Sequence, residues 1–352
     1  MKRLLTGSAL ILAVSFAPAC DKKEEDKDKS ADADKDKKSD GGDADSKDGG
    51  DEGGKGGLAG AVADAAKGGA GAAGELVKLV PEGANILVVF DAKSVFSSPL
   101  MKGNMAMLEK SEAGEMFTAA NDCKVGPDTW NKAVLGGDTD GSDKVVVVGQ
   151  ATGLGKKETL ECISKKVNEK EGSEKWKVEE ADGKVVVTID GGDTKGYSGG
   201  DDIFVIAGKD YAEAVQGLIG GNGSSAVDGS LKDAMATADT SKHVYFAGVA
   251  KGDMAQGPTA GLKHFHGSVD FSNGLAVAAS LDFGDEAKAK TTAEMFSKQF
   301  EGLKGMATGM GVPKPILDSV KIEAQGSAVS ATMNATTDDL NKVAELAQKQ
   351  MG

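Results

Sequence analysis

The composition of residues 21–57 constrains this chain more than any other feature. These residues are Lys, Asp, Glu, Ser, Gly and Ala, with no aromatic side chain and no aliphatic one larger than Ala. Such a segment cannot bury enough apolar surface to offset the entropy lost on folding. Residues 58–74 continue as an Ala- and Gly-rich stretch, in which Leu58 and Val62 are the large apolar side chains. We therefore expect residues 20–74 to be a disordered tether and the folded part to begin near Glu75.

Residues 1–19 have the pattern of a secretory signal peptide. Lys2 and Arg3 precede an apolar run over residues 4–16, which is shorter than the roughly 20 residues of a membrane span. The run ends in small residues and then Cys20, and so resembles the export signal of bacterial lipoproteins. We expect cleavage before Cys20, lipid on its side chain, and stable anchoring where more than one acyl chain is attached. Ala17 and Ala19 also suit ordinary signal peptidase, which leaves simple secretion as the alternative.

The two remaining cysteines fit an exported protein. With Cys20 modified by lipid, Cys123 and Cys162 are left to form a disulfide in an oxidising compartment. Two buried free thiols are the alternative. A catalytic thiol is disfavoured because His243, His264 and His266, which are the histidines of the chain, all lie far from both cysteines in sequence.

The charge balance excludes some partners. Lys and Arg total 41 against 55 Asp and Glu, which gives a formal net charge of -14. An acidic chain repels nucleic acid and anionic lipid headgroups. We expect no nucleic-acid partner, contact with a membrane through lipid on Cys20, and an envelope protein as a partner.

Hydrophobic periodicity predicts alternating hairpins and helices in the folded part. Strands are expected over residues 86–90, 133–135, 144–148, 176–180, 184–189, 203–207, 243–250, 268–271, 275–283, 321–323 and 328–333, and helices over residues 100–120, 156–170, 285–306 and 337–349, with one more from residue 210. Asp210 is expected to cap its helix, with Glu213 three residues on. The helix over residues 285–306 is expected to bury one apolar stripe: Ala289, Ala293, Phe296, Phe300 and Leu303.

The order of these elements in residues 75–225 repeats in residues 226–352. Residues 177–179 and 185–189 align with residues 321–323 and 328–333, and Pro258 follows its strand as Pro99 does. Because hairpins dominate, we predict an α+β fold of two similar halves. Each half is a mostly antiparallel sheet with helices packed on one face, and the whole follows a disordered tether.

Several stretches resemble a known group of proteins. These are LVPEGANILVVFDAKSVFSSPL at residues 79–100, the turn at residues 123–127, KVVVVGQATG at residues 144–153 and LDFGDEAKAKTTAEMF at residues 281–296. The chain resembles uncharacterised exported lipoproteins of Gram-negative bacteria, over roughly residues 75–350. The resemblance implies a charged tether joined to a duplicated α+β domain, and it implies no activity.

Two loops carry partial motifs. Residues 149–157 form a Gly-rich loop between a strand and a helix, but the spacing is one residue too long for a P-loop and Lys157 replaces the magnesium-binding Ser or Thr. We interpret this loop as a connector. Asp138, Asp140 and Asp143 are of the type that binds calcium, yet the Gly is misplaced for an EF-hand. A hairpin turn is the favoured interpretation.

Two further sets of side chains are candidate metal ligands. His264 and His266 would share one face of an extended segment, as a zinc or copper site needs, but they supply only two ligands. Methionines on helices could bind Cu(I), although such residues usually fill cores. They are Met101, Met105, Met107, Met306 and Met310. We predict no metal and no other cofactor.

These observations favour a lipid-anchored protein of the bacterial cell envelope, held at the inner or outer membrane with its folded part outside the cytoplasm. We expect a binding or structural role and no enzyme activity, because no catalytic constellation stands out. Two alternatives stay open. One is a carrier of lipids or other apolar ligands, and the other is a metal-dependent envelope hydrolase.

Overall fold

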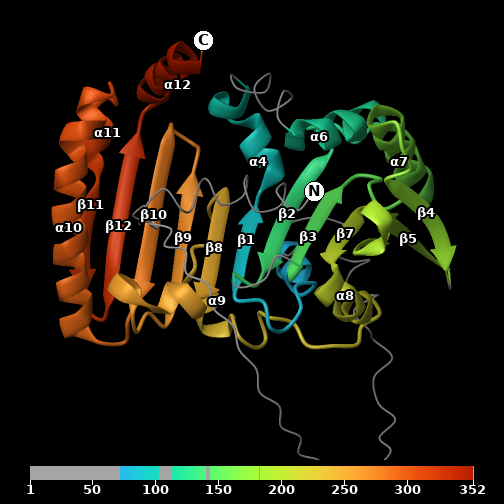
Figure 1. Ribbon diagram of the computed structural model, residues 1–352, viewed down its shortest axis with the longest axis horizontal. Coiled ribbons are helices and arrows are strands. Elements are labelled where there is room, and N and C mark those ends of the chain that lie inside the picture. The colour runs from blue at the N-terminus through green and yellow to red at the C-terminus, as the bar shows by residue number, and fades with distance from the viewer. Residues whose placement is uncertain (1–71, 103–111, 140–142, 182, 352) are drawn as a thin grey trace, which may run out of the picture. The chain divides into compact units, whose positions relative to one another are not determined.

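The computed structural model describes residues 72–102, 112–139, 143–181 and 183–351 (Figure 1). These residues belong to one compact unit. Residues 1–71, which include the predicted signal peptide, Cys20 and nearly all of the tether, lie outside the described residues. Met105, Met107 and Asp140 lie outside them as well.

A single antiparallel sheet of twelve strands organises the described residues. The strands are β1 (Ile86–Phe90), β2 (Trp130–Gly137), β3 (Val145–Ala151), β4 (Trp176–Ala181), β5 (Lys184–Ile189), β6 (Thr194–Ser198), β7 (Ile203–Gly208), β8 (Val244–Val249), β9 (His264–Asp270), β10 (Leu275–Asp282), β11 (Lys321–Gln325) and β12 (Ala328–Ala335). Their order in the sheet is β11-β12-β10-β9-β8-β1-β2-β3-β7-β6-β5-β4. Strands from both predicted halves therefore join one sheet.

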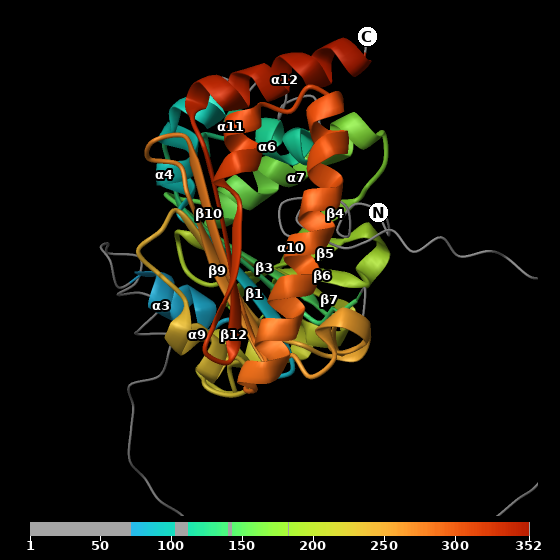
Figure 2. The same cartoon turned by 90° about the vertical axis from the view of Figure 1, so that its left-hand side faces the viewer.

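Helices cover parts of both faces of this sheet. The α-helices are α3 (Ala72–Val77), α4 (Ala92–Ser97), α6 (Glu112–Asp122), α7 (Lys157–Glu171), α8 (Ala212–Ile219), α9 (Lys232–Thr237), α10 (Glu286–Gly309), α11 (Lys314–Ser319) and α12 (Thr337–Met351). Short 3-10 turns are η1 (Asp190–Gly192), η2 (Lys209–Tyr211), η3 (Gly252–Ala255) and η4 (Gly257–Thr259). In the edge-on view of Figure 2, α10 lies on one side of the sheet and α3 and α9 lie on the other.

The alternation of side chains along β1 explains why both faces are covered. Leu87 and Val89 are buried in a core that includes side chains of α3 and α8. Val88 and Phe90 point to the opposite face and pack with Val95 of α4. A continuous apolar strand of this kind needs layers on both sides. We expected helices on one face, and the structure places them on two.

The central strand pair joins the two predicted halves. β1 pairs with β8, with Val88 opposite Phe246. Outward on each side come two more strands, β2 and β3 on one side and β9 and β10 on the other. After β3 the chain passes through α7 to the edge strand β4, and after β10 it passes through α10 to the edge strand β11. The α+β class is confirmed, and duplication of the sequence stays a prediction.

Most predicted elements are present, and the differences are local. β6 was not predicted, since Thr194–Ser198 holds only Tyr197 as a large apolar side chain. The predicted cap at Asp210 is wrong, because η2 precedes α8 and the cap residue Tyr211 makes no side-chain cap hydrogen bond. The predicted helix at residues 100–120 is described only in part, with α4 ending at Ser97 and α6 beginning at Glu112.

Candidate functional site

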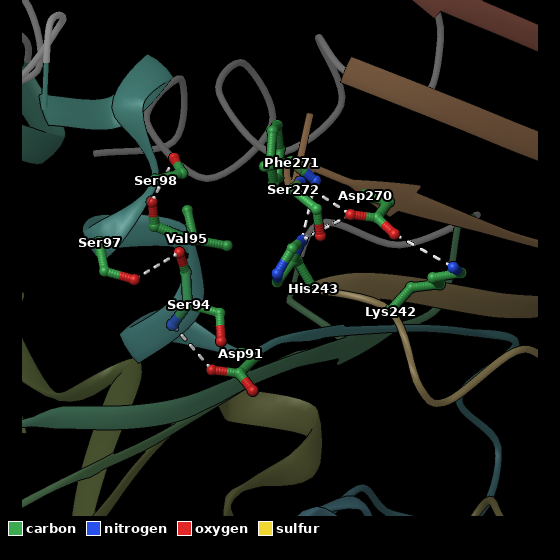
Figure 3. Close-up of polar contacts among 10 residues, drawn as sticks. All are labelled: Asp91, Ser94, Val95, Ser97, Ser98, Lys242, His243, Asp270, Phe271 and Ser272. Atoms are coloured by element: carbon green, nitrogen blue, oxygen red, sulfur yellow. Dashed lines mark hydrogen bonds and ion pairs between the residues drawn. The ribbon is translucent and has the colours of Figure 1, made fainter. Parts of the chain in front are cut away.

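A polar cluster lies where β8 begins and β9 ends, and Figure 3 shows its side chains. The His243 Nδ1 accepts a hydrogen bond from the Phe271 N–H at 2.8 Å. The same nitrogen lies 3.2 Å from the Asp270 Oδ1. The other carboxylate oxygen of Asp270 is 3.1 Å from the Lys242 Nζ. The Ser272 N–H donates to the Asp270 Oδ1 at 2.8 Å. We name these five residues the His243–Asp270 cluster.

The electrostatics of this cluster favour an ionised carboxylate. Hydrogen bonding by Ser272, through its side chain and its N–H, holds the pKa of Asp270 well below its usual range, and Lys242 adds to the effect against the cost of burial. Asp270 is thus a charged residue at the end of β9, and it contacts Lys242, which lies just before the start of β8. Nearby, the Asp91 side chain caps α4 at the Ser94 N–H, and the Asp91 N–H donates to the His243 carbonyl.

The hydrogen-bond directions do not suit general-base catalysis. In a catalytic Asp–His pair the imidazole donates its Nδ1–H to the carboxylate, which leaves Nε2 free to take a proton. Here the Phe271 N–H donates to Nδ1, so the neutral ring of His243 carries its hydrogen on Nε2. The contacts of this cluster therefore hold the residues before β8 against the end of β9 and the turn that follows β9.

His264 and His266 share one face of β9, as their spacing predicts. His264 Nε2 lies 3.3 Å from the Asp282 Oδ2 on the neighbouring strand β10. His266 Nδ1 lies 3.0 Å from the Thr237 Oγ1 at the end of α9. Burial, followed by the neighbouring His264, lowers the pKa of His266. Among the described residues, no group of three or more His, Cys, Asp or Glu side chains is placed to hold a metal ion.

The Gly-rich loop at residues 149–157 is a connector, as its spacing indicates. The Gly153 N–H donates to the Asp202 Oδ1 at 2.7 Å, and the Gly155 N–H donates to the Asp201 carbonyl at 2.8 Å. A P-loop offers such amides to a phosphate. Here the Asp202 carboxylate accepts the hydrogen bond from one of these amides, the Gly153 N–H. A Cβ added at Gly155 would overlap the carbonyl oxygens of Gly200 and Ile203. The close approach of these backbone atoms therefore requires glycine at this position.

The aspartate-rich turn joins β2 to β3, as predicted. The Asp138 N–H donates to the Lys144 carbonyl at 2.9 Å, and the Asp138 Oδ2 lies 3.5 Å from the Lys144 Nζ. The buried Asn85 holds the same turn through two hydrogen bonds with Thr139, at 2.8 and 2.9 Å. Asp138 is therefore a residue of the hairpin turn between β2 and β3, and its contacts with Lys144 stabilise that turn.

The predicted disulfide between Cys123 and Cys162 is present. It joins the turn after α6 to α7, with the two Cα atoms 5.9 Å apart and a sequence separation of 39. Cys123 is buried in the core between these helices and the sheet, and Cys162 packs against that core.

Two depressions are present on the described surface. One, of about 660 Å³, lies between α7 and β4 and is lined by charged and polar residues such as Glu161, Lys165 and Glu174 around the edge of Trp176. The other, of about 390 Å³, lies beside the His243–Asp270 cluster and includes Asp270, Asn334 and Asp339. Asp339 is already engaged, since it accepts from the Thr336 hydroxyl at 2.7 Å.

Met306 near the end of α10 and the C-cap residue Met310 are exposed, which was not predicted. Met306 has 63% of its surface exposed and Met310 has 55%. Leu303, expected to be buried, is 55% exposed as well. The stripe expectation is correct for Ala289 and Ala293, which are buried against the sheet. It fails at Leu303, in the part of the helix that follows Phe300.

The His243–Asp270 cluster was also missed from the sequence. Its residues are separated by about a whole hairpin, and strand pairing alone brings them together. One local signal was available, because Asp270 followed two residues later by Ser272 is typical of a turn in which the aspartate accepts the second N–H.

Comparisons with known proteins give few matches. No family model and no curated protein matches the chain. Two solved structures of TP0453 are similar to it. Crystal form III has a TM-score of 0.47 at 9% identity, over 75% of this chain and 95% of that chain. Crystal form I has a TM-score of 0.45 at 12% identity, over 77% and 97%. Among the described residues, no helix combines the length and apolar character needed to span a membrane.

Proposed function

We propose that this chain is a lipid-anchored protein of the bacterial cell envelope, whose folded part has a binding or structural role. The N-terminal pattern that ends at Cys20 supports the anchor. The tether at residues 20–74 would allow the folded part an r.m.s. distance of about 40 Å from the bilayer.

The structural observation that supports export is the disulfide between Cys123 and Cys162. Disulfides persist in oxidising compartments such as the bacterial periplasm, and they are rare in the reducing cytosol. With Cys20 lipidated, the pairing uses both other cysteines of the chain.

A non-catalytic role is supported by what the polar side chains do. His243 accepts a backbone N–H, Asp270 is held by Ser272 and Lys242, and Asp202 occupies a loop amide. Each of these groups is used to hold strands and turns together. The carrier alternative gains no support from the depression between α7 and β4, since charged and polar residues form most of its lining.

The anchor is tested by metabolic labelling with radioactive palmitate. We expect label on the wild-type protein, none on Cys20→Ser, and the wild-type protein in the membrane fraction. Label that persists on Cys20→Ser, or a wild-type protein found unlabelled in the soluble envelope fraction, would contradict the anchor. A thiol assay on the denatured protein checks the disulfide independently, because two reactive thiols besides Cys20 would exclude it.

A further inference from the structure

The depression of about 390 Å³ lies at the end of the sheet where β10 begins and β12 ends. Figure 1 shows α11 and α12 at this end of the sheet, and the first residues of both helices belong to the walls. More of the lining is apolar than polar, and the apolar side chains are Leu275, Ala276, Pro315 and Ala335. A concave, mostly apolar wall with a few polar groups is the usual form of a small-molecule site.

The walls of this depression are held by close contacts. The Ser319 hydroxyl at the end of α11 lies 2.6 Å from the Asn334 carbonyl and accepts the Asn334 N–H at 2.9 Å. A Cβ at Gly274 would overlap the Ala335 carbonyl and would also meet Thr336. The turn after β9 therefore rests directly on the corner between β12 and α12, and the depression is formed before any ligand arrives.

Asp339 supplies one carboxylate oxygen that the fold does not use. The residue lines the depression and is only 6% exposed. Its Oδ2 accepts from the Thr336 hydroxyl at 2.7 Å, and that hydroxyl accepts the Asp339 N–H at 3.2 Å, which caps the start of α12. Among the described residues, its Oδ1 has no hydrogen bond, and the Lys342 Nζ lies 3.8 Å from it on a side chain that is 65% exposed. Because a buried charge is costly without a close partner, Oδ1 is an available acceptor for a positively charged ligand.

We propose that this depression binds a small organic ammonium ion with an apolar body. The ammonium group donates a charge-assisted hydrogen bond to the Asp339 Oδ1, and the body packs on the apolar wall around Ala276. Asp270 lines the same depression and adds negative charge, but its carboxylate already contacts Lys242. Asp339 is therefore the main counter-ion of the ligand.

The charge and the lining together select this class of ligand. Asp270 and Asp339 are the ionisable side chains of the lining, and the chain has a formal net charge of -14, so the surface attracts cations and repels anions. A calcium ion takes six to eight oxygen ligands, and the described residues include no group of three acidic, His or Cys side chains placed for a metal. The inference rests on the binding role in the proposed function, and it does not depend on the anchor.

Calorimetric titration with hexylammonium chloride tests the ligand class. The protein is the chain from residue 20 with Cys20→Ser, which carries no lipid that could bind the probe. Hexylammonium should saturate one site. Hexanol and hexanoate lack the positive charge, and ammonium chloride lacks the apolar body, so each should bind at least about tenfold more weakly. Equal binding of hexanol, tighter binding of hexanoate, or no saturable binding of hexylammonium would overturn the proposal.

Two alanines of β10 give a matched pair of variants. Ala276 and Ala278 lie two residues apart on one face of the strand, opposite Asn334 and Thr332 of β12. Of the two, Ala276 lines the depression and Ala278 does not. Ala276→Leu should fill the depression and weaken hexylammonium binding at least about tenfold, whereas Ala278→Leu should leave the Kd unchanged. Equal effects of the two substitutions would place the ligand elsewhere and overturn the proposal.

Asp339→Asn tests the counter-ion. It removes the charge and keeps a side-chain oxygen for the Thr336 hydroxyl, and circular dichroism checks that α12 is retained. Hexylammonium should bind at least about tenfold more weakly, and the weaker binding of hexanol should not change. An unchanged Kd for hexylammonium would overturn the proposal. None of these titrations bears on palmitate labelling of Cys20, so the binding site and the anchor can fail separately.

Discussion

Single aspartates close the turns of the second half of the sheet. Asp239, Asp270 and Asp282 each accept, through Oδ1, the N–H of the residue two positions later. The second carboxylate oxygen of Asp270 lies 3.1 Å from the Lys242 Nζ, whereas that of Asp282 lies 3.3 Å from the His264 Nε2. Because its partner is a lysine, Asp270 is the aspartate on which we test the contribution of charge.

We predict that Asp270→Asn lowers the free energy of unfolding by about 1.5–3 kcal/mol at pH 7, the range for hydrogen bonds to a charged group. The pKa of Asp270 is lower in the folded chain than in the unfolded chain. Its contribution is thus fully present above the ordinary aspartate pKa of about 3.9, and it is lost as pH falls through the folded value. Urea unfolding of both proteins at several pH values measures the difference.

The matched control for that prediction is Asp193→Asn. Asp193 is 82% exposed and lies 3.8 Å from the Lys209 Nζ, so it forms an ion pair of the weak surface type. We expect no measurable change in stability at any pH. If Asp270→Asn lowers the free energy of unfolding by the same amount at pH 7 and at pH 2, the shape of the Asp270 side chain rather than its charge stabilises the fold.

Among the elements, α7 and β4 are joined by one amide side chain. The Asn168 Oδ1 accepts the N–H groups of Lys175 and Trp176, at 2.7 and 2.8 Å, and its Nδ2 donates to the Trp176 carbonyl at 2.7 Å. The Ser164 hydroxyl donates to the same carbonyl at 2.7 Å. β4 is an edge strand, so these bonds supply partners that no neighbouring strand gives it.

We predict that Asn168→Ala lowers the free energy of unfolding by about 1–3 kcal/mol, because it leaves the Trp176 N–H without its acceptor. The Lys175 N–H keeps the Ser173 carbonyl, and the Trp176 carbonyl keeps the Ser164 hydroxyl. Asn168→Asp should cost less, since it keeps the acceptor for two N–H groups and loses only the donor. Chemical denaturation followed by tryptophan fluorescence measures both. Equal losses for the two variants would mean that the Nδ2–H bond to the Trp176 carbonyl dominates.

The disulfide is the second link at α7. In the chain-entropy view, closing a loop with a sequence separation of 39 stabilises the fold by about 4 kcal/mol. We predict that Cys123→Ser with Cys162→Ser lowers the unfolding free energy by about this amount. Reducing agent should destabilise the wild type by a similar amount and leave the double variant unchanged. An equal effect of reductant on the double variant would contradict the assignment.

The elements show how far the sequence predicts this fold. The antiparallel pairing of β4 with β5 and of β9 with β10 was predicted correctly, because turn chemistry acts between near neighbours. β6 was missed since a strand held between β5 and β7 needs little apolar character of its own. Leu303 was assigned to the core because periodicity shows which residues share a face. It does not show whether anything covers that face.

At the scale of the whole molecule, the pairing of β1 with β8 decides whether the halves are independent. Five residues of β1 pair with β2 on one side and with β8 on the other. The repeat pattern in the sequence suggested two separate sheets. A continuous sheet exposes no unpaired edge at its centre, where each half alone would have one. Nothing in the sequence of β1 distinguishes these outcomes, because pairing between distant strands depends on the complete fold.

We predict that the folded part unfolds in a single transition. Both tryptophans, Trp130 and Trp176, lie in the first predicted half, so their fluorescence reports that half alone. Far-UV circular dichroism reports all strands and helices. The two signals should give the same midpoint in urea. Leu87→Ala, at a fully buried site on β1 opposite Ala247 of β8, should lower stability by about 3 kcal/mol and shift both midpoints together. Midpoints that separate would show that the halves fold independently despite sharing one sheet.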